Sequence, residues 1–157
     1  MIFADILMWF LLIMGTYIVM VAYWLAAEAL LPDFVDGCRK RFAVAPWHQF
    51  GLGLLIFLPL FGVGLTGIRA PQAALKFAGI VFLLGLLLWA LIGSSGIAAQ
   101  VGLGLGYPEQ NWRRVLRGGS VLGLTFILPF LGWSLMLVVF IVGIGSTVGG
   151  LRRKAVG

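Results

Sequence analysis

Long uninterrupted runs of apolar residues dominate the chain, and short polar stretches separate them. The uncharged runs extend from Ile6 to about Ala27, from Phe50 to about Ile68, from Phe77 to Tyr107 and from Val121 to about Gly149. A helix of about 20 apolar residues crosses the roughly 30 Å hydrocarbon core of a bilayer. The pattern therefore predicts four transmembrane helices, of which the third and fourth are longer than one crossing requires.

Composition strengthens this prediction. The 157 residues are 62% hydrophobic and 10% charged, with a mean hydropathy of +1.11, whereas soluble domains are about 45–50% apolar and about 25% charged. A soluble domain of this size lacks the interior to bury so much apolar surface, and disordered chains are poor in apolar residues. A single cysteine, Cys38, rules out a disulfide framework. We expect an all-α integral membrane protein with one transmembrane domain over residues 1–157.

An internal repeat suggests how the helices are arranged. Residues 52–62 read LGLLIFLPLFG and residues 122–132 read LGLTFILPFLG, with six of eleven positions identical at an offset of 70. Two spans per copy would make a parallel repeat, with copies at about 1–70 and 71–157. This predicts two tandem helical hairpins, the second helix of each kinked at Pro59 or Pro129. The alternative is chance similarity between Leu-, Gly- and Pro-rich segments.

Two basic elbows connect the predicted spans. The first, from Pro32 to Pro46, is expected to form a short interfacial helix with Asp33 as its N-cap. Its apolar residues Phe34, Val35, Cys38 and Phe42 recur at roughly helical spacing, opposite Arg39 and Arg41. The second elbow places Trp112 beside three arginines.

The distribution of basic residues bears on orientation and on lipid partners. The elbows hold six (Arg39, Lys40, Arg41, Arg113, Arg114 and Arg117), and the other side holds five (Arg69, Lys76, Arg152, Arg153 and Lys154). Because the first helix usually dominates orientation, we expect cytoplasmic elbows that contact anionic lipids, with both termini on the outer side. A re-entrant hairpin turning between Pro129 and Trp133 would instead return the basic tail to the elbow side. Confinement of the net charge of +6 to short turns argues against nucleic-acid binding.

Few residues in the chain offer chemistry. His48, the sole histidine, is a candidate pigment or haem ligand, although a headgroup-level position beside the interfacial Trp47 is the favoured explanation. Glu28 ends the first span, where it pairs with a partner or acts as a functional carboxylate. Cys38 is either a modified thiol or a small packing residue. We expect no metal site and no cofactor, with lipid contacts instead.

A serine pair offers the remaining possibility for catalysis. Ser94 and Ser95 lie in a Gly-Ser-Ser-Gly sequence, but we find no second His or Lys at membrane depth to activate a nucleophile. Hydroxyls in spanning helices usually bond to the backbone or to a neighbouring helix. The sequence therefore favours a protein that is not an enzyme.

Glycine is abundant, with 23 copies. Small residues spaced along a transmembrane helix let two backbones approach closely. We therefore expect helix packing and kinks to involve Pro59, Gly62, Gly102, Gly106, Gly119, Gly123, Pro129, Gly132, Gly145 and Gly149.

The run from Leu128 to Trp133, followed by Gly143-Ile144-Gly145, resembles the closing segment of small multi-pass bacterial membrane modules of unknown function. An N-terminal helix followed by a basic amphipathic elbow is also similar to these modules, which are sometimes joined to bactofilin-type β-helical domains. The resemblance implies a bacterial inner-membrane protein. It does not carry over the polymer-forming role of bactofilins, because this sequence has no β-helical repeat.

These features favour a non-enzymatic accessory or scaffolding subunit that packs into a larger membrane complex, photosynthetic or respiratory, through glycine-rich helix faces. The alternative is a small transporter or channel with a pathway at the proline kinks. That alternative predicts a polar, water-accessible cavity lined by Thr66, Ser94, Ser95, Thr125 and Ser134. The preferred function predicts that the same residues are sealed in helix packing.

Overall fold

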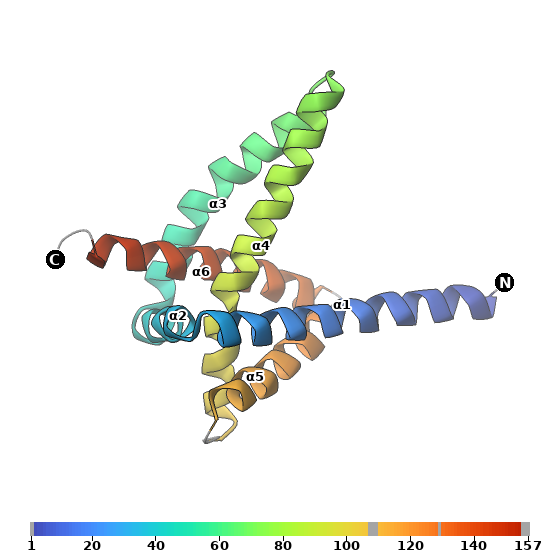
Figure 1. Ribbon diagram of the computed structural model, residues 1–157. Coiled ribbons are helices and arrows are strands. Elements are labelled where there is room, and N and C mark those ends of the chain that lie inside the picture. Colours follow the sequence, from blue (N-terminus) through green and yellow to red (C-terminus); the bar gives the residue numbers. More distant parts are fainter. Residues whose placement is uncertain (1, 107–109, 129, 155–157) are drawn as a thin grey trace.

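The computed structural model describes residues 2–106, 110–128 and 130–154, with side chains described from Phe3 to Val148 within these ranges. This part of the chain is helical throughout, with short connections (Figure 1). Four of its helices are long and apolar enough to cross a membrane, which confirms the predicted class of multi-pass, all-α membrane protein. The helices are α1 (Ile2–Leu30), α2 (Pro32–Val44), α3 (Pro46–Arg69), α4 (Ala73–Gly104), α5 (Asn111–Phe126) and α6 (Leu131–Lys154).

The first elbow forms the helix α2, as predicted, but the predicted N-cap is wrong. Leu31 occupies the N-cap position and no side chain caps the helix. Pro32 starts α2 because its fixed φ angle suits the first helical position and it has no N–H to leave unpaired. Asp33 consequently lies inside the first turn, where its negative charge interacts favourably with the helix dipole.

The predicted continuous helix from Val121 to about Gly149 is also wrong. The chain forms α5 up to Phe126, turns, and resumes as α6 at Leu131. Phe130 in this turn has a φ angle of 63°, in the left-handed region. A Cβ atom on Gly132 would overlap the carbonyl groups of Thr125 and Phe126, so the turn closes tightly only around a glycine. Pro129 itself lies outside the described residues.

The helices pair differently from the expected tandem hairpins. α3 and α4 form an antiparallel hairpin through the connection at residues 70–72, and α3 also packs on α6. α1 packs on α4 and α5, and it has no contact with α3 among the described residues. α3 continues through Pro59 without a break. The arrangement of spans as consecutive hairpins and the proline kinks are therefore not confirmed.

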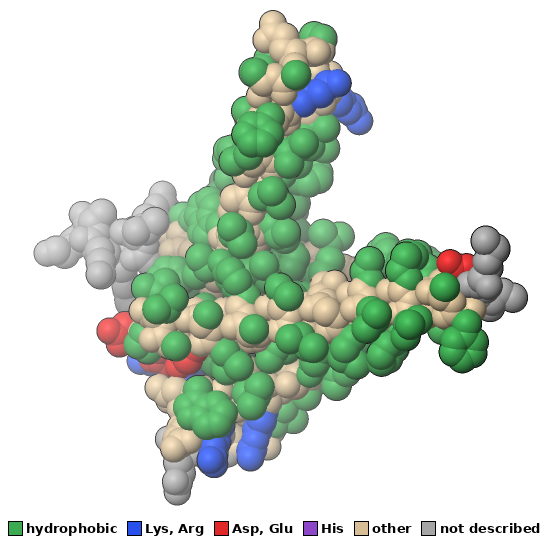
Figure 2. All heavy atoms as spheres, turned by 45° about the vertical axis from the view of Figure 1, so that its right-hand side comes forward, with side chains coloured by type: hydrophobic (Ala, Val, Ile, Leu, Met, Phe, Trp, Pro, Cys, Tyr) green, Lys and Arg blue, Asp and Glu red, His purple; other side chains and the backbone are tan. Residues whose placement is uncertain are grey.

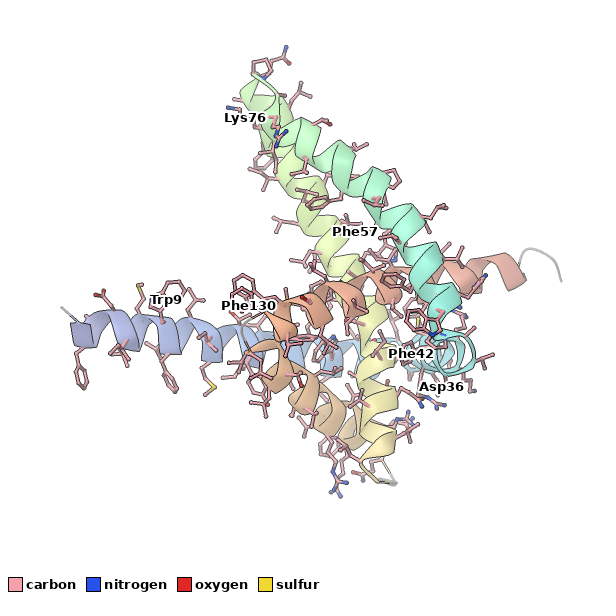
Figure 3. The ribbon with its side chains drawn as sticks, turned by 180° about the vertical axis from the view of Figure 1, so that it is seen from behind. Trp9, Asp36, Phe42, Phe57, Lys76 and Phe130 are labelled. Atoms are coloured by element: carbon pink, nitrogen blue, oxygen red, sulfur yellow. The ribbon has the colours of Figure 1, made fainter. Side chains whose placement is uncertain are left out.

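Two apolar arms project from a common centre (Figure 1). One is the N-terminal half of α1, and the other is the α3–α4 hairpin, whose tip lies beside Lys76 (Figure 3). Hydrophobic side chains cover both arms, and charged side chains gather at their tips and around α2 and α5 (Figure 2). The centre lies where the C-terminal half of α4 is surrounded by α1, α2, α5 and α6.

Candidate functional site

The most enclosed part of the molecule is a segment of α4 that we call the α4 hub, residues 93–99. All seven of its residues are buried. A helix is buried around its whole circumference only when neighbours cover every face, and here α1, α2, α5 and α6 do so. The sequence of the hub, Gly-Ser-Ser-Gly-Ile-Ala-Ala, suits this position because small side chains leave room for four surrounding helices.

Glycines at the crossings around the hub permit close approach of backbones. A Cβ atom on Gly93 would overlap the carbonyl of Gly143 in α6, and one on Gly118 in α5 would overlap the carbonyl of Ala98. A Cβ atom on Gly96 would lie 2.7 Å from the Cβ of Cys38 in α2. These helices therefore touch through backbone, and any larger side chain at these positions would push them apart.

The hydroxyl groups of the hub are engaged within the protein. Ser94 Oγ accepts a hydrogen bond from Trp24 Nε1 at 2.9 Å and donates to the carbonyl of Leu91 at 2.9 Å. Ser95 Oγ donates to the carbonyl of Ile92 at 2.5 Å. Both serines are fully buried. These contacts are those expected of structural serines.

Beside the hub, a buried ion pair joins α1 to α5. Glu28 Oε1 lies 3.9 Å from Arg114 Nη2, and the two side chains are 5% and 12% exposed. Within the described part of the chain, Glu28 Oε2 and Arg114 Nε find no hydrogen-bond partner. Separating two buried charges leaves each one desolvated and uncompensated, so the pair ties the first half of the chain to the second.

The basic side chains of the first elbow bond to Asp36 within the elbow and to the backbone of α6. Asp36 accepts hydrogen bonds from Arg39 Nη2 at 2.6 Å and Nε at 2.9 Å, and its second oxygen lies 2.7 Å from Lys40 Nζ. The bond from Lys40, with help from Arg39, lowers the pKa of the Asp36 carboxyl. Arg41 Nη1 donates to the carbonyl of Ser146 at 2.6 Å. The C-terminal half of α6 therefore lies on the elbow side.

Cys38 is a packing residue at the point where α2 meets α4 and α6. Its side chain is 1% exposed and lies against Gly96. Burial raises the pKa of the Cys38 thiol, against weaker opposing effects of Ser146 and Arg41. A raised pKa reduces the thiolate fraction at neutral pH, and the thiolate is the reactive form.

Alkylation of Cys38 by a maleimide is therefore expected to be slow in the folded protein. The comparison is a Cys38→Ala, Val44→Cys variant, because Val44 is 86% exposed at the end of the same helix. We expect at least a roughly hundredfold slower rate for Cys38, because reaction requires local opening of the fold. The rate should rise with pH only above the range in which an exposed thiol ionises. Equal rates for the two thiols would contradict the described packing of α2.

The surface of the described residues includes three apolar grooves between the helices. One of about 390 Å³ runs between α1, α5 and α6, and one of about 210 Å³ between α3, α4 and α6. A third of about 580 Å³ lies where α1 and α4 diverge. Met136 of α6 borders all three. Their linings are almost entirely aliphatic and aromatic, so they suit acyl chains or apolar helices.

The other predicted site residues lie at separate places in the structure. His48 is exposed at the start of α3, next to Trp47. Its role as a pigment or haem ligand stays a prediction. Arg113 stacks over Trp112 at 5.3 Å and is exposed together with Arg117. Among the described residues, no group of three His, Cys, Asp or Glu side chains could hold a metal ion. The side chains of Arg152, Arg153 and Lys154 lie outside the described residues.

The predicted packing glycines fall into two groups. Five lie where an added Cβ atom would meet another helix or turn at less than van der Waals distance: Gly102, Gly119, Gly123, Gly132 and Gly145. Gly62 faces open space, and Gly106 adopts a φ angle of 131° just after α4. Pro59 is exposed within α3. Gly149 and Pro129 are not among the positions whose surroundings the structure describes.

Sequence reasoning missed two contacts at the site. It noted Glu28 and Arg114 separately, but local patterns do not reveal that an acid at the end of one helix faces a base 86 positions later. The Trp24–Ser94 bond was also missed, although the two residues are 70 apart. That separation equals the offset of the internal repeat, and the repeat was the signal that could have indicated this contact.

Comparison of the chain with family models, with curated proteins and with solved structures finds no match.

Proposed function

We propose that the protein is a non-enzymatic accessory or scaffolding subunit of a larger complex in the bacterial inner membrane. Its apolar arms contact other membrane subunits, and its basic elbows contact anionic lipid headgroups. The hub holds the arms in place. The proposed complex is one of bacterial energy metabolism, photosynthetic or respiratory.

The observation that carries this proposal is the contrast between a sealed centre and free arms. In the apolar windows of α1 and α3, 11% of residues are buried within the chain, against 50% for α6. Hydroxyl groups at the centre are bonded internally. A protein arranged in this way offers apolar helix surface to neighbours and keeps its polar groups for its own packing.

The turn between α5 and α6 supports a proposed orientation in the membrane. Because Ser146 of α6 lies at Arg41, the tail belongs with the elbows. The elbow side then carries nine basic residues, six in the elbows and three in the tail, against Arg69 and Lys76 at the hairpin tip. By the positive-inside rule the elbows and the C-terminus lie in the cytoplasm. In this topology α5 and α6 form a re-entrant pair that enters from the cytoplasmic side.

The arrangement gives less support to a transporter or channel. Thr66 is exposed on α3 and donates to the carbonyl of Val63, whereas Ser94 is sealed in the hub. Thr125 and Ser134 lie beside the turn between α5 and α6. These hydroxyls line none of the three grooves described above, whose walls are apolar. The prediction that they are sealed in helix packing is confirmed for Ser94 and Ser95, but it is wrong for Thr66 and Ser134, which are exposed. A pathway through the protein needs polar lining to replace the hydration of a solute.

The test is the mass of the protein extracted in a mild detergent. We expect a stable particle heavier than the 17.0 kDa chain, containing defined membrane subunits identified by mass spectrometry. The same extraction of a variant with charged residues on α1, Leu7→Lys and Ile13→Lys, should release the chain from the particle. A monomer that passes a solute or turns over a substrate in liposomes would overturn the proposal.

A further inference from the structure

Two of the surface grooves share part of their lining under the 70-residue repeat. The groove between α3, α4 and α6 is lined by Phe57, Leu83, Leu86, Leu87 and Ala90. Adding or subtracting 70 from these numbers gives Ile127, Ile13, Thr16, Tyr17 and Met20, all of which line the groove between α1, α5 and α6. The hydrogen bond between Trp24 and Ser94 joins equivalent positions at the crossing of α1 and α4. The repeat is therefore present in three dimensions, with α5 placed on α1 as α3 is placed on α4.

The equivalence does not extend over the whole fold, because α4 packs on α5 whereas α1 has no contact with α3 among the described residues. Along the two grooves it also ends at one place. Beyond Phe57, α3 continues and packs its Gly64 and Gly67 against Leu83 and Gly79 of α4. Beyond Ile127, the chain turns away, and the equivalent residues begin α6, which packs on α3 and α4 instead. The N-terminal half of α1 is thus left without the antiparallel helix that covers the N-terminal half of α4.

The uncovered position is visible on α1. Trp9, at the place equivalent to Gly79, is 59% exposed and lines the groove. Ile13 lies one turn further on, and Trp133 closes the groove from α6. Figure 3 shows Trp9 on the free half of α1 and Phe130 at the turn where the helical cover ends. Phe130 and Trp133 are themselves 87% and 69% exposed.

We infer that this groove is the docking site for a transmembrane helix of a different polypeptide, which runs antiparallel to α1 and continues the line of α5. The inference rests on the proposed function and names the kind of partner and the place where it binds. The occupant is an apolar helix with small residues facing Trp9 and Ile13, because Gly64 and Gly67 play this part at the equivalent position. Small residues allow helix contact in lipid, where no hydrophobic effect drives association.

A second copy of this chain fits the groove less well. Copies inserted in the same orientation and related by a two-fold axis along the membrane normal would bring α1 to α1 in parallel, not antiparallel. Antiparallel contact with α3 of another copy would be head-to-tail, and such contacts have to close into rings or extend indefinitely. The geometry therefore assigns the site to another protein.

Site-specific photo-crosslinking in intact membranes tests the inference. Benzoylphenylalanine replaces Trp9 or Ile13 on the groove side, and Leu7 or Ile18 on the opposite side of α1, where exposure is similar. We expect the groove positions to give one discrete protein adduct, severalfold stronger than any adduct from the opposite positions. The crosslinked peptides should belong to one apolar segment rich in small residues. Because the helices run antiparallel, position 9 should capture a residue C-terminal to the one captured from position 13.

Several outcomes would overturn the inference. These are adducts to lipid alone, adducts to a second copy of the chain, equal labelling around α1, and capture in parallel order. If the extracted complex persists while crosslinks arise only from the α3–α4 arm, the proposed function stands and the α1 site fails. If the chain is monomeric in every membrane extract, both fail. Unchanged thermal unfolding of each labelled variant shows that the fold is retained.

Discussion

Replacement of Gly53 by leucine is expected to destabilise the protein strongly, whereas the same replacement of Gly51 is expected to be harmless. A Cβ atom on Gly53 would overlap the carbonyl of Ile141, and the backbone nitrogen of Gly145 lies 3.1 Å from the same point. A side chain there forces α3 and α6 apart. Overpacking of this kind costs up to about 3 kcal/mol, which lowers the Tm of a chain of this length by roughly 10 °C.

Gly51 supplies a matched control in the same helix. Nothing lies within 4 Å of a Cβ atom at this position, and glycine in a helix interior costs up to about 1 kcal/mol relative to alanine. The Gly51→Leu variant should therefore unfold at the same temperature as the parent or slightly higher. Thermal unfolding in detergent, followed by circular dichroism, measures both. Equal losses in the two variants would show that α3 and α6 do not cross at Gly53.

The helices themselves could be predicted because each depends on local composition. The apolar runs beginning at Ile6 and Phe50 lie within α1 and α3, most of the run beginning at Phe77 lies within α4, and the elbow after Pro32 is helical. A membrane requires its spanning segments to satisfy their own backbone groups, so a long apolar run has little choice other than a helix. This constraint acts within a single segment and needs no knowledge of its neighbours.

The break at the end of α5 shows where local sequence stops being informative. Residues 52–62 and 122–132 share six of eleven identities, including the proline. The first copy stays within one helix and the second spans a turn between two helices. Gly62 faces open space, whereas the equivalent Gly132 is pressed against the end of α5. The difference arises from what surrounds each copy. After the turn, α6 packs on both α3 and α4, whereas α3 stays a single helix along α4.

The same limit applies to the candidate site. The sequence indicated that small residues would mediate packing, but several of the tightest crossings involve glycines at positions 53, 93 and 96, in α3 and α4, that no spacing pattern marked out. Which glycine faces a neighbour depends on the rotation of each helix about its axis. In an apolar helix with little amphipathic character, the sequence gives no strong signal for that rotation.

Loss of one partner of the Glu28–Arg114 pair is expected to be the other severe change. In the Arg114→Met variant, the Glu28 side chain, 5% exposed, remains buried without its opposing charge. Breaking a buried ion pair in this way costs about 3–5 kcal/mol. The Glu28→Leu variant leaves the arginine unpaired and should be comparably unstable. Unfolding by a denaturing detergent, titrated into the mild one and followed by tryptophan fluorescence, measures each loss.

The double variant, Glu28→Leu with Arg114→Met, distinguishes pairing from general disruption. Replacement of both charges by apolar residues of similar size is often neutral, so it should recover most of the stability that either single change removes. Arg113→Met is the control for loss of a positive charge on α5, because Arg113 is exposed, and surface changes are usually within about 0.5 kcal/mol. Additive losses in the double variant would mean that Glu28 and Arg114 act independently. Since this pair joins the two halves of the chain beside the hub, a non-additive result would show that it helps to hold α1 against α5, in addition to the close contacts of Gly119 and Gly123 with α1.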